Sequence, residues 1–202
     1  MPELSTKEKL LKIGKEEFLE KGYKDASLRE IAKKAGFTLG AFYGYYPNKE
    51  ALFNEIVQEP ARVLFEHYEH THHHFDALPE KQKIAEMGRV SGEGLKKMVK
   101  HIYENFDVFR LVFFCAVGTQ YEHYLQRFID LENASTYRFL ETLRSQGYAV
   151  ELDDDLIHIL TSGMFYGFTE IVDHNMEREK AERYVEQLRI FYTAGWYELM
   201  GL

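Results

Sequence analysis

The sequence predicts an all-α fold of about nine helices, and three observations support this prediction. Apolar residues recur at the three- and four-residue spacing of a helix along most of the chain. Capping patterns, in which Ser is followed three residues later by Glu, precede two of the first apolar runs. A convincing strand-like alternation is missing, although the dense apolar run at 106–117 fits either a strand or a buried helix.

The N-terminal helices are short. Ser5 and Glu8 form a capping box ahead of the first helix, and Gly22 is its expected stop. A second box, Ser27-Leu28-Arg29-Glu30, begins a second short helix. Gly36 ends that helix with a tight turn, because glycine adopts the left-handed backbone that such turns require.

A third helix is expected over 38–46, with Thr38 as its cap and Pro47 as its stop. Asn48 caps a fourth helix, and the helices lengthen after residue 57. No Gly/Ser linker separates the two parts. We expect the later helices to run to about 75 and then over 80–104, 106–117, 119–146, 152–175 and 178–200.

Charge is distributed unevenly. The chain has a net charge of −8, but residues 1–57 carry 10 Lys or Arg and 9 Asp or Glu, whereas residues 58–202 carry 15 and 24. This asymmetry favours contact with a polyanion through the N-terminal end. The single cysteine, Cys115, fits a cytoplasmic protein, and neither a signal peptide nor an 18-residue apolar span is found, so no membrane partner is expected.

The second and third helices, joined through Gly36, form a helix-turn-helix pattern. Ala32 and Gly36 are small, as a crossing of two helices through a short turn requires. The third helix lacks charge, and its Gly40, Ala41 and Gly44 allow its backbone to approach a groove closely. Considered residue by residue, the aromatic side chains of this helix are equally typical of a core.

Residues 22–57, GYKDASLREIAKKAGFTLGAFYGYYPNKEALFNEIV, resemble the DNA-binding segment of the TetR-type repressor family, and the resemblance extends over roughly 5–57. It implies a helix-turn-helix DNA-binding domain at 1–50 and a helical effector-binding and dimerisation domain at 51–202. It further implies a homodimeric repressor that binds a palindromic operator, with half-sites about 34 Å apart. A small apolar or aromatic effector would release the DNA.

The family pattern implies phosphate contacts by the side chains at 27, 38, 43, 45 and 49, with 39–42 nearest the bases. Ala26, Leu39 and Gly44 depart from the Thr, Lys and His that are frequent in the family at those positions. We therefore expect base reading to rely on thymine methyl groups and DNA shape. The expected DNA-binding residues are Ser27, Thr38, Leu39, Gly40, Ala41, Phe42, Tyr43, Tyr45 and Lys49.

The last two predicted helices have the pattern of a dimer interface, because Gly163 and Gly167 lie four residues apart and the final helix carries an apolar stripe. In the resembled family such a helix pair forms a four-helix interface; an intramolecular core is the alternative. The expected interface residues are Gly163, Gly167, Tyr184, Leu188, Phe191 and Gly195.

Aromatic residues are abundant, with 15 Phe, 14 Tyr and one Trp. Such rings line pockets for apolar ligands, although at helical spacing they are more often core. The effector's signal would pass through the long helix after Asn48. The expected pocket residues are His101, Phe109, Phe113, Tyr121, Tyr124, Phe128, Tyr137 and Phe165.

Alternative functions come from other features. His67, His70 and His74 share one helical face, with His72 and His73 adjacent, which fits either a metal-responsive regulator or a solvated helix end. A helical protein-interaction module is a further alternative. We expect no enzyme and no cofactor, because the zinc-protease, nucleophile-elbow, phosphate-loop and dinucleotide motifs are missing.

Overall fold

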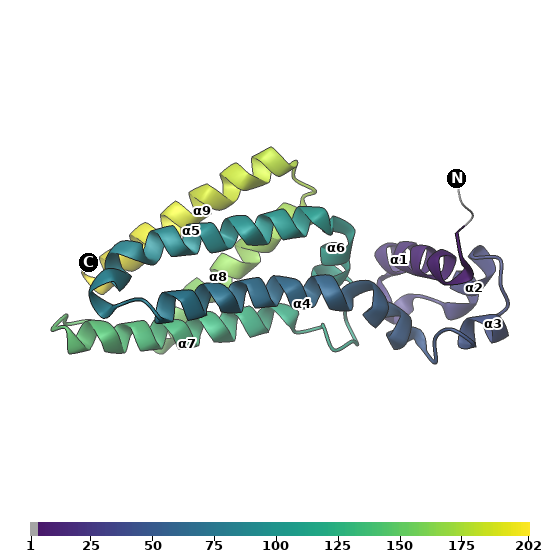
Figure 1. Ribbon diagram of the computed structural model, residues 1–202, viewed down its shortest axis with the longest axis horizontal. Coiled ribbons are helices and arrows are strands. Elements are labelled where there is room, and N and C mark those ends of the chain that lie inside the picture. The colour runs from purple at the N-terminus through teal and green to yellow at the C-terminus, as the bar shows by residue number, and fades with distance from the viewer. Residues whose placement is uncertain (1–3) are drawn as a thin grey trace. The chain divides into compact units, whose positions relative to one another are not determined.

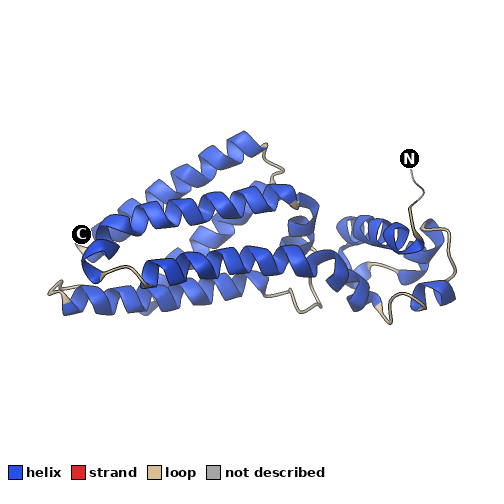
Figure 2. Ribbon diagram, in the orientation of Figure 1, coloured by secondary structure: helices blue, strands red, loops and turns tan. Residues whose placement is uncertain are grey.

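The computed structural model describes residues 4–202, and over that range every regular element is an α-helix (Figures 1 and 2). The all-α prediction is confirmed, including at 106–114, where the apolar run is a helix that buries Phe109, Leu111 and Val112. Residues 1–3, the start of the expected DNA-binding domain, lie outside the described residues. The helices are α1 (Thr6–Asp25), α2 (Leu28–Lys34), α3 (Leu39–Tyr43), α4 (Lys49–Asp76), α5 (Glu80–Glu104), α6 (Phe106–Phe114), α7 (Tyr124–Ser145), α8 (Asp154–Asp173) and α9 (Arg178–Met200).

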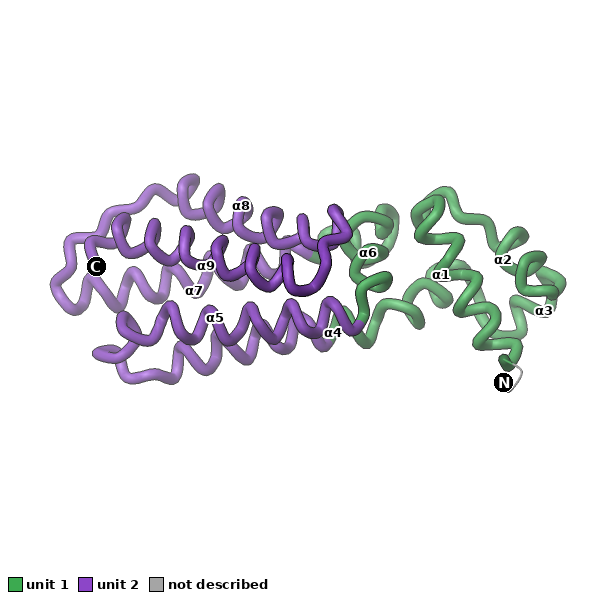
Figure 3. Tube along the Cα trace, turned by 90° about the horizontal axis from the view of Figure 1, so that it is seen from above, with its two compact units in different colours: residues 1–62, 105–124 green, residues 63–104, 125–202 purple. Residues whose placement is uncertain are grey.

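The chain divides into two compact units, which Figure 3 colours separately. The first unit comprises residues 1–62 and 105–124, and the second comprises 63–104 and 125–202. This division differs from the expected boundary between 50 and 51, which falls inside α4. The reason is packing: α6 lies against α1, so a segment that the sequence analysis assigned to the second domain belongs to the first unit.

The core of the first unit consists of apolar side chains from α1, α2, α3, α4 and α6. Phe18 and Phe53 meet edge to face with ring centroids 5.2 Å apart. Gly14 allows α1 and α4 to approach, because a Cβ at this position would lie 2.7 Å from Leu52 Cδ2. Ile31 and Phe42 close the same core from the helix-turn-helix segment.

Caps and glycines end the helices largely where the sequence indicates. The Ser5 capping box forms, Thr38 Oγ1 accepts from the Ala41 N–H at 3.1 Å, and Asn48 Oδ1 accepts from the Ala51 N–H at 2.8 Å. Gly36 has the left-handed φ of +82° expected of the turn. The prediction of a second capping box at Ser27 is wrong, because the side chain of Ser27 makes no capping hydrogen bond.

The third helix is shorter than predicted. It ends at Tyr43 and not at Tyr46, and the amides of Tyr45 and Tyr46 both donate to the Phe42 carbonyl in the turn that follows. Pro47 disfavours helical backbone at Tyr46, which is buried in the first unit.

The second unit is a bundle in which α5 packs along α9 and α8 also contacts α9. One end of its core is an apolar cluster that includes Phe139, Leu143, Ile157 and Met200. Positive φ at Gly147 and Asn175 marks the turns before α8 and α9, at the predicted breaks. In the described part of the chain, no helix is both long and apolar enough to cross a membrane.

Candidate functional site

The α3 part of the helix-turn-helix presents a surface of uncharged side chains. Thr38, Gly40 and Ala41 are exposed, and Leu39 is half-buried. Tyr43 and Tyr45 keep 52% and 49% of their surface accessible, although aromatic rings of this size usually lie in a core. Ser27 is half-buried at the start of α2. The expected DNA-binding residues are thus gathered on the first unit, and most remain accessible.

Phe42 is an exception and corrects the sequence analysis. Its side chain is fully buried and packs against Tyr43 and Tyr46, with ring centroids 5.7 Å from each. The ring therefore holds α3 on the domain, and it is not available to touch bases. At helical spacing, core and contact positions on one short helix alternate too closely for a sequence pattern to separate them.

Lys49 is engaged by the protein itself. Its Nζ donates to the backbone carbonyls of Lys24 and Ala26, both at 3.0 Å, and lies 4.6 Å from the centroid of the Tyr23 ring. Burial lowers the pKa of Lys49 despite the nearby charge of Asp25. Lys49 thus ties the start of α4 to the end of α1, a role that the sequence did not indicate.

Glu17 fastens α1 to α2. Its side chain is completely buried, and its two oxygens accept from Lys21 Nζ and Lys34 Nζ, each at 2.7 Å. The Ser27 backbone N–H lies 3.5 Å from the same carboxylate. Burial alone would raise the pKa of Glu17, but the hydrogen bonds from Lys21, Lys34 and Ser27 outweigh it and lower the pKa to about 2.

The second unit contains a cavity of about 120 Å³. Its wall is mostly apolar and includes Trp196, the chain's one tryptophan. Eight polar or charged side chains and two tyrosines also line it, and ligand pockets combine an apolar wall with polar groups in this way. The lining residues are Tyr68, Thr71, His72, Phe75, Met87, Val90, Ser91, Gly94, Leu95, Glu132, Ser135, Thr136, Phe139, Met164, Arg189, Tyr192, Thr193, Trp196 and Met200.

None of the residues expected to line an effector pocket lines this cavity. Four of them, at 109, 113, 121 and 124, belong to the first unit. Phe128 and Phe165 are buried in the core of the second unit, where both pack against Tyr68. Tyr137 is exposed, and the His101 ring stacks edge-on against His67, 5.7 Å away. The abundance of aromatic residues therefore did not locate the cavity, and several of the residues chosen for it belong to the protein core.

Three polar side chains meet at the cavity wall. The Tyr68 hydroxyl donates a short hydrogen bond to Glu132 Oε2, and His72 Nε2 lies 3.1 Å from the same oxygen. Burial would raise the pKa of Glu132, but the interactions with His72 and Tyr68 lower it overall. The sequence held one signal for this group: Glu132 continues the apolar stripe of α7 formed by Phe128 and Phe139.

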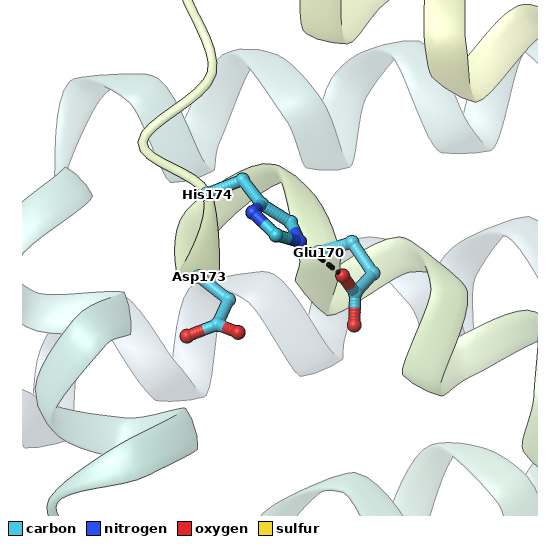
Figure 4. A group of neighbouring side chains, drawn as sticks. All are labelled: Glu170, Asp173 and His174. Carbon is cyan, nitrogen blue, oxygen red and sulfur yellow. Dashed lines mark ion pairs between the residues drawn. The ribbon is translucent and has the colours of Figure 1, made fainter.

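His67, His70 and His74 line one small pocket, but among the described residues their ring nitrogens do not form a group close enough to share an ion, and the metal-responsive alternative has no support. His67 faces His101, whereas His72 faces Glu132. Among residues 4–202, one group of three potential ligands is found elsewhere, at Glu170, Asp173 and His174 (Figure 4). His174 pairs with Glu170 at 2.8 Å on the protein surface, where acidic groups are common without an ion, so we assign this group no metal role.

The expected interface residues on α8 and α9 separate into two sets. Gly167, Tyr184 and Leu188 join the two helices within the chain: the Tyr184 hydroxyl donates to the Gly167 carbonyl at 2.9 Å, and Leu188 lies 3.6 Å from the Cβ position of Gly167. In contrast, Gly195 is exposed, and Phe191 keeps 71% of its surface accessible. Gly163 is exposed too, but it also allows α9 to approach, because a Cβ there would lie 2.9 Å from the Tyr192 hydroxyl. Further exposed apolar side chains on these helices are Leu156, Ile159, Tyr166, Ile190 and Leu199.

Comparison with known proteins agrees with this arrangement. Residues 10–56 match the family described as bacterial regulatory proteins, tetR family. An uncharacterized HTH-type transcriptional regulator of Bacillus subtilis, YdgC, is 43% identical over 56 residues, which are 28% of this chain and 29% of that protein. The probable acrEF/envCD operon repressor of Escherichia coli K12 is 28% identical over 178 residues, which are 83% of this chain and 76% of that protein.

Solved structures share the fold along nearly the whole chain. SCO3833, a TetR-family regulator of Streptomyces coelicolor, superposes with a TM-score of 0.63 at 17% identity, covering 96% of this chain and 94% of that one. At this identity the likeness concerns the fold alone. Residues 10–56, which contain the helix-turn-helix, match the tetR family of bacterial regulatory proteins, and the chain as a whole has the fold of TetR-type regulators.

Proposed function

We propose that the chain is a repressor that binds a palindromic operator as a homodimer and leaves it when a small molecule occupies the cavity of the second unit. The observation that carries the DNA-binding part is the exposed surface of α3 and the turn after it, where Tyr43 and Tyr45 accompany the small residues Gly40 and Ala41. Because these residues lack bulk, the α3 backbone can approach a groove closely, while the tyrosine hydroxyls reach phosphates. The name of the Escherichia coli relative supports repression.

DNA binding is tested on a duplex enriched from a random pool by the protein itself. In gel-shift titrations we expect Tyr43→Ala and Tyr45→Ala each to weaken binding to this duplex about tenfold, because each loses a phosphate contact. The control is Tyr148→Ala, which removes an exposed tyrosine of the second unit and should change affinity less than twofold. Equal affinity for every duplex, unaltered by either substitution, would contradict the proposal.

The homodimer is proposed to form through the exposed apolar side chains of α8 and α9. Phe191 and Ile159 are 71% and 63% accessible, which is unusual for large apolar side chains on neighbouring helices. A second copy of the same pair would bury them in a four-helix arrangement. We expect Phe191→Glu to sediment as a monomer and Tyr148→Glu to remain dimeric. An unaltered chain that sediments as a monomer at micromolar concentration would overturn the proposal.

Effector release follows from linkage. A ligand lowers operator affinity only by as much as it prefers the conformation that binds DNA poorly. The cavity supplies a place for such a ligand, and residues 1–50 and 51–202 remain the proposed DNA-binding and effector-binding domains. The proposal includes a cytoplasmic location, where the DNA is, and a mode of action without catalysis.

A further inference from the structure

Glu132 has one oxygen engaged and one left over. Both of its partners, the Tyr68 hydroxyl and His72 Nε2, contact Oε2. No hydrogen bond to Oε1 is found from any described residue. The side chain keeps 26% of its surface accessible and lines the cavity. A carboxylate only accepts hydrogen bonds, so the vacant position on Oε1 is suited to an N–H or O–H donor from a ligand.

The two side chains on the cavity wall that can carry positive charge are both engaged: His72 contacts Glu132, and Arg189 pairs with Glu186. Arg189 Nη2 lies 2.6 Å from Glu186 Oε1, its Nε lies 3.1 Å from the other oxygen of Glu186, and Nη1 donates to the Gly88 carbonyl at 3.3 Å. A ligand carboxylate would therefore compete with Glu186 for Arg189 and would also be repelled by Glu132. The wall favours a cation over an anion.

The rest of the wall suits the body of an organic cation. Aromatic rings of Tyr68, Phe75, Phe139 and Trp196 line the cavity, and the faces of such rings attract cations. The volume of about 120 Å³ is close to that of an engineered cavity of about 150 Å³ that holds benzene. Since the cavity is the smaller of the two, its volume limits the ligand to about the size of a single ring.

We infer that the cavity of the second unit binds a small aromatic or aliphatic amine in its cationic form, with the ammonium donating to Glu132 and the apolar body held by the aromatic wall. The inference rests on the proposed function only in regarding this cavity as the effector site. It narrows the effector from any apolar compound to one chemical class.

The first test titrates the full chain with three probes of similar size and different charge: benzylammonium, benzyl alcohol and benzoate. Trp196 is the one tryptophan and lines the cavity, so its fluorescence reports occupancy. We expect benzylammonium to bind at least tenfold more tightly than either other probe, since a hydrogen bond between two charged groups exceeds a neutral one. Equal or tighter binding of benzyl alcohol or benzoate, or no binding of any probe, would overturn the inference.

The second test removes the charge of Glu132 at constant shape. In Glu132→Gln we expect benzylammonium to bind about tenfold more weakly and benzyl alcohol to change less than twofold. Glu141→Gln, which neutralises an exposed glutamate on the same helix, is the matched control and should leave both affinities unchanged. A Glu132→Gln variant that binds benzylammonium as tightly as the unaltered chain contradicts the inference.

The two proposals fail separately. The probe comparison uses the unaltered chain without DNA, so it stands even where the Glu132→Gln variant folds poorly. If the chain prefers benzylammonium but shows no duplex preference, the inference stands and the proposed function is wrong. If the chain binds its selected duplex but shows no preference for the cation, the proposed function stands and the inference is wrong.

Discussion

Each unit of this protein places a carboxylate on an apolar helix stripe, but Glu17 is fully buried and Glu132 is only partly buried. In the first unit, both oxygens of Glu17 are engaged, by Lys21 and Lys34, and the side chain has no accessible surface. In the second unit, Glu132 is contacted at one oxygen alone and lines a cavity. A fully satisfied carboxylate fastens two helices, whereas a half-satisfied one beside empty space is available to a ligand.

The largest difference between the two carboxylates is expected when each is replaced by glutamine, which removes the charge and keeps the shape. We expect Glu17→Gln to lower the free energy of unfolding by about 2 kcal/mol, because two half-exposed lysines lose the buried charge that holds them. Glu132→Gln should cost less than about 1 kcal/mol, since an amide oxygen still accepts from Tyr68. Urea unfolding followed by far-UV circular dichroism measures both, and Trp196 fluorescence reports the second unit separately.

Glu16→Gln is the control for the first of these variants, because Glu16 neighbours Glu17 but is exposed. Its free energy of unfolding should stay within about 0.5 kcal/mol of the unaltered chain. Equal losses in Glu17→Gln and Glu132→Gln would mean that both carboxylates are fastenings, and the contrast between the units would disappear.

Acid should reveal the same fastening in the unaltered chain. The folded pKa of Glu17 is lowered from 4.5 to about 2, so its stabilisation is present above pH 4.5 and disappears as the pH falls towards 2. The difference in unfolding free energy between the unaltered chain and Glu17→Gln should therefore shrink across this window. Urea unfolding at a series of pH values measures it; a difference that stays constant would show that Glu17 stabilises through packing.

A smaller effect is expected where the partner of Glu132 is removed. Tyr68→Phe should lower the free energy of unfolding by about 1.5 kcal/mol, because the partly buried Glu132 carboxylate loses a hydrogen bond from a buried hydroxyl. The same change removes one of the interactions that lower the pKa of Glu132. Tyr148→Phe, at an exposed tyrosine, is the control and should have no measurable effect. If both variants lost the same free energy of unfolding, the hydrogen bond from the Tyr68 hydroxyl to Glu132 would not contribute to stability.

Sequence reasoning reached the fold and the first unit more completely than the second. Caps at Ser5, Thr38 and Asn48 act within three residues of the chain, so the sequence displays them directly. The cavity joins residues as distant as Tyr68 and Trp196, and their meeting depends on packing that no local pattern encodes.

A charged residue within an apolar helix stripe was the sequence signal for both carboxylate sites, and the sequence analysis did not use it. Glu17 lies on the stripe of Leu10 and Phe18, and Glu132 lies on that of Phe128 and Phe139. The sequence shows that both glutamates lie on buried faces, but it does not distinguish them, because their partners come from other helices or from another turn. Whether a buried charge is satisfied is a property of the folded chain.

The finest comparison between the units uses two helical glycines with free space around them. A Cβ at Gly40 in α3 meets only Thr38 Oγ1 at 3.8 Å, and one at Gly195 in α9 meets nothing within 4 Å. Since alanine favours a helix over glycine by about 0.5–1 kcal/mol, Gly40→Ala and Gly195→Ala should both slightly stabilise the isolated chain in urea unfolding.

The effects of the two substitutions on DNA binding and on dimerisation should differ. Gly40→Ala should weaken binding to the selected duplex while sedimentation is unchanged, because the added methyl group separates α3 from the groove. Gly195→Ala should instead change the monomer–dimer equilibrium. A loss of duplex affinity in both variants, with dimerisation intact, would show that the two surfaces are not separate and that close approach at α3 is not what glycine provides there.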